Sequence, residues 1–123
     1  MIHTWAWSLR DDARLSKQAF ELLASAAEIF ISAVTLYEIT QKVRLGKWHD
    51  MDGFAAQLEE LALRQGVQIA VVTGPVAAQA GLLDWTHRDP FDRMIAATAL
   101  VPDLALISAD TTFDSLPGLR RVW

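Results

Sequence analysis

The sequence reads His87-Arg88-Asp89-Pro90-Phe91-Asp92-Arg93-Met94-Ile95-Ala96-Ala97-Thr98-Ala99 in the segment that says most about this chain. Two acids, Asp89 and Asp92, open a predicted helix whose other face is small and apolar. The run Leu106-Ile107-Ser108-Ala109-Asp110 follows soon after and closes on a third acid. Carboxylates placed beside a helix start and a strand end can meet at one edge of a sheet, where their oxygen atoms suit a hard cation such as Mg²⁺.

Helical periodicity alternates with short apolar runs along the rest of the chain. The pattern predicts helices over residues 12–27, 34–45, 52–65, 75–85 and 90–100. It predicts strands over residues 28–32, 67–72 and 104–108, with 119–123 as a candidate edge strand. Gly46 and Gly66 are expected helix ends, and Pro75 and Pro90 suit the first turns of their helices. Nearly all-apolar strands that alternate with helices indicate an α/β fold, with a parallel sheet covered on both faces.

The composition argues against disordered, disulfide-bonded and membrane-spanning proteins. The 123 residues support one domain with one core, and a hydrophobic fraction of 52% argues against disorder. The absence of cysteine excludes disulfides, thiolate metal sites and a cysteine nucleophile. No apolar run approaches the roughly 18 residues that cross a bilayer, and the N-terminus lacks the pattern of a signal peptide. We therefore expect a cytoplasmic protein made of a single domain, residues 1–123, without a membrane partner.

The charge balance bears on nucleic-acid binding. A net charge of −4 makes the chain a poor general binder of nucleic acid, because backbone affinity comes mainly from Lys and Arg. Any such contact must be local or metal-assisted. Arg88 and Arg93 flank the acids and could contact phosphate, or they could pair with Asp89 or Asp92. Solvated surface charge is the simplest interpretation of the basic residues taken singly.

Each acid has a structural interpretation beside a functional one. Asp89 precedes Pro90 and suits an N-cap, and Asp92 would stabilise the helix dipole. Glu38 lies among apolar residues and needs a partner, which could be a cation or Lys42 one turn further along. A cluster of like charges resists full ionisation unless a cation compensates for it. Such a cluster suits metal-assisted phosphodiester hydrolysis, in which the metal activates water and stabilises charge on the phosphate.

Other side chains carry weaker signals. Ser108 could orient substrate or metal-bound water, although a plain strand-end hydroxyl is the simpler interpretation. Three aromatic residues could stack on bases, or belong to the core or a dimer interface: Trp5, Trp7 and Tyr37. The three histidines show no ligand spacing, so we expect surface or capping roles for His3, His49 and His87. The sequence has no P-loop, Rossmann glycine pattern or nucleophile elbow.

These motifs resemble those of the PIN-domain family, and in particular the VapC-type toxins of bacterial toxin–antitoxin pairs. The run Ser32-Ala33-Val34-Thr35-Leu36-Tyr37-Glu38-Ile39 is similar to the family's second acidic motif, and Arg44-Leu45-Gly46-Lys47 follows it as in many members. The segment from His87 to Ala99 is similar to the third motif, and Ser108-Ala109-Asp110 to the fourth. The run His3-Thr4-Trp5-Ala6-Trp7 looks like the segment after the first strand, so the resemblance extends nearly from end to end.

The resemblance implies a three-layer sandwich in which helices flank a parallel sheet. It also implies Mg²⁺ or Mn²⁺, endonucleolytic cleavage of RNA, a homodimer, and a cognate antitoxin that blocks the site. By motif, Glu38, Asp92 and Asp110 would be the metal ligands and catalytic residues. The candidate phosphate or substrate contacts beside them are Arg88, Arg93 and Ser108.

One departure from the family pattern keeps more than one function open. The family begins with a strand that ends in Asp-Thr-His, whereas Met1 and Ile2 stand here in place of the Asp and the Thr. We therefore expect the usual first strand to be lacking. The first hypothesis is a metal-dependent ribonuclease toxin, and the second is a truncated, catalytically impaired module that dimerises or binds an antitoxin without cutting. A third is an α/β interaction domain whose acids are only caps and surface salt bridges.

Overall fold

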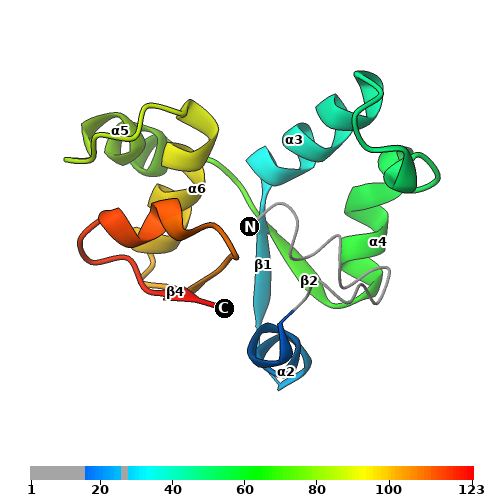
Figure 1. The fold of residues 1–123 in the computed structure, drawn as a ribbon, viewed down its shortest axis with the longest axis horizontal. Coiled ribbons are helices and arrows are strands. Elements are labelled where there is room, and N and C mark those ends of the chain that lie inside the picture. The colour runs from blue at the N-terminus through cyan, green and yellow to red at the C-terminus, as the bar shows by residue number, and fades with distance from the viewer. Residues whose placement is uncertain (1–15, 26–27) are drawn as a thin grey trace.

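The computed structural model describes residues 16–25 and 28–123 (Figure 1). Its helices are α2 (Lys17–Ser25), α3 (Ala33–Arg44), α4 (Leu58–Arg64), α5 (Gly74–Leu82) and α6 (Pro90–Leu100). Its strands are β1 (Ile29–Ser32), β2 (Val67–Ala70), β3 (Leu106–Ile107) and β4 (Arg121–Val122). Three short 3₁₀ segments complete it: η1 (His49–Met51), η2 (Ala55–Gln57) and η3 (Thr111–Ser115).

The strands confirm the predicted parallel pairing. β1 pairs in parallel with β2, from Ile29 opposite Val67 to Ser32 opposite Ala70, and β3 pairs in parallel with β4. Among the described residues the strands form two two-stranded sheets rather than the single sheet that we expected. The prediction that the usual first strand is lacking concerns residues outside the described ranges, so it stays a prediction.

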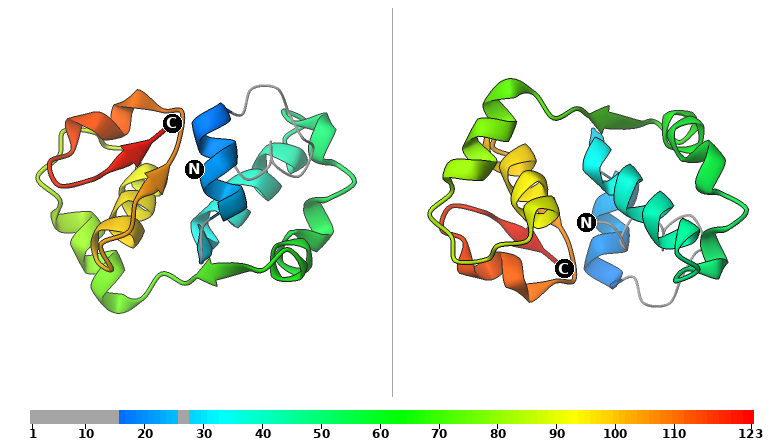
Figure 2. Two further views of the ribbon diagram at one scale, coloured as in Figure 1. Left: turned by 90° about the horizontal axis from the view of Figure 1, so that it is seen from below. Right: turned by 90° about the horizontal axis from the view of Figure 1, so that it is seen from above.

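An apolar cavity of about 200 Å³ lies between the two sheets. β1 lines it with Ile29 and Phe30, and β3 lines it with Leu106 and Ile107. Leu22 of α2 and several residues of α6 complete its wall. Figure 2 shows the same division of the molecule, with α2, β1 and α3 on one side and α5, α6 and β4 on the other.

Most helix boundaries follow from local caps. The side chain of Ser32 accepts a hydrogen bond from the Val34 amide at the start of α3, as N-cap residues do. At the other end, Gly46 takes a φ of +72°, and the amides of Gly46 and Lys47 bond to the carbonyls of Val43 and Lys42. These two bonds form a Schellman motif, which needs the left-handed backbone that glycine adopts easily.

The predicted helix over residues 52–65 is wrong in its first half. The chain instead forms η1 and η2, and a regular helix begins only at Leu58. None of the residues that precede η1, η2 and α4, namely Trp48, Phe54 and Gln57, supplies a side-chain cap. Without a cap the first amides lack partners, so the segment tightens into 3₁₀ turns.

The core falls into separate clusters that meet at the sheets. One cluster joins β1, α3, α4 and β2 around Ile31, Ile39 and Met51. A second packs α6 against the C-terminal part of the chain, and Ala96 and Ala97 of α6 are fully buried. None of the helices in the described part of the chain has the length and apolar character that spanning a bilayer requires.

The end of α3 offers a test with a matched control. Gly46 and Gly53 both have open space where a Cβ would lie, but only Gly46 has a positive φ. We expect Gly46→Ala to lower the free energy of unfolding by about 1 kcal/mol, and Gly53→Ala to leave it nearly unchanged. Urea unfolding of both variants measures this, and equal effects would contradict the cap assignment.

Candidate carboxylate metal centre

Glu38 lies on the second turn of α3 and has a polar atom without a partner. Its Oε1 atom is buried and makes no hydrogen bond. Lys42 was the alternative partner of Glu38; its ammonium lies 5.8 Å from the centre of the Trp48 ring, and its charge lowers the pKa of Glu38 only as a minor cause. One turn earlier, the fully buried hydroxyl of Thr35 also lacks a partner. Residues three apart share a helix face, so these two unpartnered oxygen-bearing groups are neighbours on α3.

The pKa of Glu38 is raised from 4.5 to about 7, first by burial and then by the charges of Asp92 and Asp89, while the charge of Lys42 lowers it slightly. The helices α3 and α6 pack against each other. Rings also join the two helices beside the acids, because Tyr37 and Phe91 lie 5.4 Å apart. The fold therefore holds negative charges near one another at the starts of two helices.

The start of α6 confirms one structural prediction. Asp89 is the N-cap, and its Oδ1 accepts hydrogen bonds from the amides of Phe91 and Asp92 at 2.9 and 3.2 Å. Pro90 occupies the first helical position, where a missing amide hydrogen costs nothing. Asp92 follows in the first turn, where the helix dipole favours a negative charge.

His87 does not have the surface or capping role that we expected. Its Nε2 lies 2.7 Å from Oδ2 of Asp92, and both side chains are mostly buried. The spacing rules for metal ligands miss this contact because His87 lies in the loop before α6, not on the helix itself. His49 is an exposed residue next to Asp52, as expected, and His3 lies outside the described residues.

Asp110 follows β3 and caps η3. Its Oδ1 accepts a hydrogen bond from the Thr112 amide at 2.9 Å. The buried hydroxyl of Ser108 accepts a hydrogen bond from the Asp110 amide, so Ser108 holds the backbone of the acid. Burial raises the pKa of Asp110, but the hydrogen bonds from Thr112 outweigh it and hold the pKa below its ordinary value, and the charge of His87 is a minor cause in the same direction.

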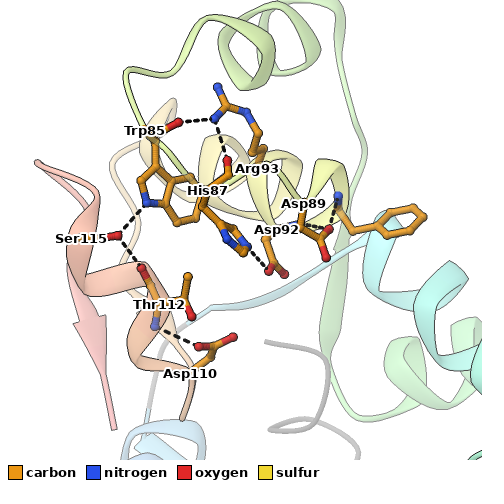
Figure 3. Close-up of polar contacts among 9 residues, drawn as sticks. Trp85, His87, Asp89, Asp92, Arg93, Asp110, Thr112 and Ser115 are labelled. Carbon is orange, nitrogen blue, oxygen red and sulfur yellow. Dashed lines mark hydrogen bonds and ion pairs between the residues drawn. The ribbon is translucent and has the colours of Figure 1, made fainter.

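The structure relates the three predicted acids only in pairs, through the charge of Asp92 on Glu38 and through His87. Glu38 responds to the charge of Asp92, and His87 both contacts Asp92 and acts on Asp110. Figure 3 shows His87 between Trp85 and Asp92, with Asp110 at the start of η3. His87, Asp89 and Asp92 each offer a ligand atom within 4.8 Å of the others, whereas among the described residues neither Glu38 nor Asp110 belongs to such a group. We call Glu38, Asp89, Asp92 and Asp110 the carboxylate cluster. Its oxygen donors and the unpartnered Glu38 oxygen fit a hard divalent cation.

Arg93 has neither of the two roles that we expected. Its guanidinium donates to five backbone carbonyls at the end of α5 and in the loop that follows, those of Ala80, Gly81, Leu83, Trp85 and His87. These bonds use the donors that would otherwise meet phosphate or a carboxylate. Arg88 is exposed beside the cluster, so its phosphate role stays a prediction.

Of the aromatic residues that could stack on bases, the structure describes Tyr37. The ring is half-exposed and lies against Phe91. Trp5 and Trp7 lie outside the described residues.

Comparisons with known proteins give one matching family model and one similar fold. A sequence model of the PIN domain matches residues 3–119. Among solved structures, the fold is similar to the "Crystal structure of VapBC2 from Rickettsia felis bound to a DNA fragment from their promoter". That similarity has a TM-score of 0.72 and 18% sequence identity, and covers 99% of this chain and 94% of the other. No match was found among curated proteins.

Removing the Arg93 guanidinium should destabilise the protein. We expect Arg93→Met to lower the free energy of unfolding by about 3 kcal/mol, because several carbonyls lose a charged donor. The control Arg88→Met changes an exposed arginine and should stay within about 0.5 kcal/mol of the original protein. Urea unfolding compares them, and similar losses in both variants would contradict the structural role of Arg93.

Glu38 should make stability depend on pH. Since its folded pKa is raised, the stability present below pH 4.5 is lost as the pH rises through about 7. Glu38→Gln removes this loss and should be more stable than the original protein at pH 8, by about 1 kcal/mol after solvent screening is allowed for. The two should be equally stable at pH 4.

The measurement is urea unfolding from pH 4 to 8.5 in the presence of a chelator. A constant difference across that range would show that the Glu38 carboxyl titrates normally.

Proposed function

Since this chain belongs to the PIN domain family, we propose that it is a metal-dependent endoribonuclease that acts as the toxin of a toxin–antitoxin pair. The observation that carries the proposal is the unpartnered, buried Oε1 of Glu38 beside the charges of Asp92 and Asp89. A carboxyl group in that environment is stabilised in its charged form by a cation. The interpretation of the acids as caps and surface salt bridges alone leaves Glu38 unexplained.

Glu38, Asp92 and Asp110 are the proposed ligands of Mg²⁺ or Mn²⁺ and the proposed catalytic residues. A divalent cation there supplies activation of water and stabilisation of charge on the phosphate. Local hydrogen bonds hold the rest of the site. Asp89 caps the helix that carries Asp92, and the Ser108 hydroxyl accepts a hydrogen bond from the Asp110 amide. Because these bonds set the backbone before a ligand arrives, little reorganisation is needed on binding.

Arg88 is the proposed phosphate contact. It is exposed and stands directly before Asp89, and Arg93 is already bonded to backbone carbonyls. With a net charge of −4, the chain needs such a local contact to bind RNA at all. The proposed partners are therefore an RNA substrate, a second copy of the chain and a cognate antitoxin. The proposed location is the cytoplasm.

The alternative is a catalytically impaired module that dimerises or binds an antitoxin without cutting RNA. One sequence feature favours it, because Met1 and Ile2 stand where the family has Asp-Thr. Three acidic ligands in place of four would bind the cation less tightly. Metal affinity and cleavage, measured together, separate the two functions.

Asp92→Asn should abolish RNA cleavage and growth inhibition without unfolding the protein. The matched control is Asp103→Asn, an exposed position with a φ of +58° that Asn also adopts readily. Cleavage of a fluorescent single-stranded RNA and calorimetric Mn²⁺ titration measure the effect, and circular dichroism checks folding.

Saturable Mn²⁺ binding at micromolar levels by the original protein supports the enzyme, as does its loss in Asp92→Asn. Absence of binding up to millimolar Mn²⁺ favours the impaired module. Cleavage that persists in purified Asp92→Asn would reject the proposed catalytic role.

A further inference from the structure

The contact between His87 and Asp92 joins the carboxylate cluster to the rest of the molecule. Nε2 of His87 lies 2.7 Å from Oδ2 of Asp92, and the side chains are 30% and 22% exposed. Among the described residues, no other hydrogen bond or ion pair reaches this carboxyl group. Oδ2 is thus occupied by the imidazole, and Oδ1 remains for another ligand.

The His87 ring is held from the side opposite to Asp92. It packs against the ring of Trp85, with centroids 4.9 Å apart, and Trp85 is buried. Trp85 is fixed in turn, because its Nε1 donates to Oγ of Ser115 at 2.8 Å and its ring packs against Phe113. A ring supported in this way has little freedom to leave Asp92.

The backbone of His87 is fixed as well. Its carbonyl accepts a hydrogen bond from the Arg93 guanidinium at 2.9 Å, and Arg93 is the residue after Asp92 on α6. His87 is therefore bound to the first turn of α6 both by its ring and by its main chain (Figure 3).

The same contacts reach the element that carries Asp110. The hydroxyl of Ser115 donates to the carbonyl of Thr112, and the Thr112 amide donates to Asp110. A continuous series of contacts thus runs from Asp92 through His87, Trp85 and η3 to Asp110 (Figure 3). It joins two carboxylates that come from separate elements.

We propose that His87 is a positioning residue of the carboxylate cluster: its hydrogen bond to Oδ2 of Asp92 fixes the orientation of that carboxylate for binding a divalent cation. This inference rests on the proposed function. Groups that hydrogen-bond metal-ligating carboxylates fix their orientation, and their loss typically weakens metal binding about 10–100-fold.

Direct ligation by His87 is a competing role. His87, Asp89 and Asp92 have ligand atoms within 4.8 Å of one another. However, Nε2 of His87 already bonds to Asp92. Ligation through Nε2 would require this bond to break, so the geometry favours positioning.

The test compares His87→Ala with His87→Gln, since the Gln amide can place a donor near the position of Nε2. The control is His49→Ala, which removes an exposed histidine next to Asp52. Calorimetry measures the Kd for Mn²⁺, urea unfolding measures stability, and cleavage of a fluorescent single-stranded RNA measures activity. If His87→Ala does not fold, His87→Asn replaces it, because Asn is too short to reach Oδ2.

We expect His87→Ala to weaken Mn²⁺ binding about 10–100-fold, and His87→Gln to restore the Kd to within about threefold. His49→Ala should bind as the original protein does. Unchanged Mn²⁺ affinity in His87→Ala, with or without a loss of stability, overturns the proposal. Failure of His87→Gln to restore binding also overturns it and indicates ligation by the imidazole. If the original protein itself neither binds Mn²⁺ nor cuts RNA, the proposed function fails instead.

Discussion

The close packing of α6 against α3 and α5 is the contact on which the carboxylate cluster depends. Ala96 and Ala97 are fully buried and small, so neighbouring helices can approach the α6 backbone closely. This packing puts Asp92 beside Glu38 of α3, and it puts Arg93 at the end of α5. Apolar contact therefore holds together acids that repel one another. The free energy of the core offsets that repulsion.

The acids of the cluster differ in how well their surroundings stabilise the charged carboxylate. Asp89 and Asp110 each accept backbone amides, which stabilise a charged carboxylate. Asp92 has the helix dipole and the contact with His87. The Oε1 atom of Glu38 accepts no hydrogen bond from the part of the chain that the structure describes, and the pKa of Glu38 is raised to about 7. Glu38 is therefore the acid of the cluster whose charged form would gain most from a bound cation, because no hydrogen bond from a described residue reaches its Oε1 atom.

Local signals in the sequence predicted the elements that carry the site. The boundaries of α6 follow from Asp89, Pro90 and Pro102, and those of α3 follow from its apolar period and Gly46. The 3₁₀ turns before α4 escaped prediction, because an apolar period gives no information about a missing cap. The division into two sheets escaped it too, since runs of apolar residues do not encode which strands pair.

The sequence by itself determined the family, the helices and strands around the site, and the acids that are candidate ligands. Tertiary structure alone decided that His87 contacts Asp92, that Arg93 donates hydrogen bonds to five backbone carbonyls, and that the Lys42 ammonium lies over the Trp48 ring. Composition and spacing describe which side chains share one face of one element. Contacts between elements depend on how the loops place one element against the next. Packing of the whole core sets that placement.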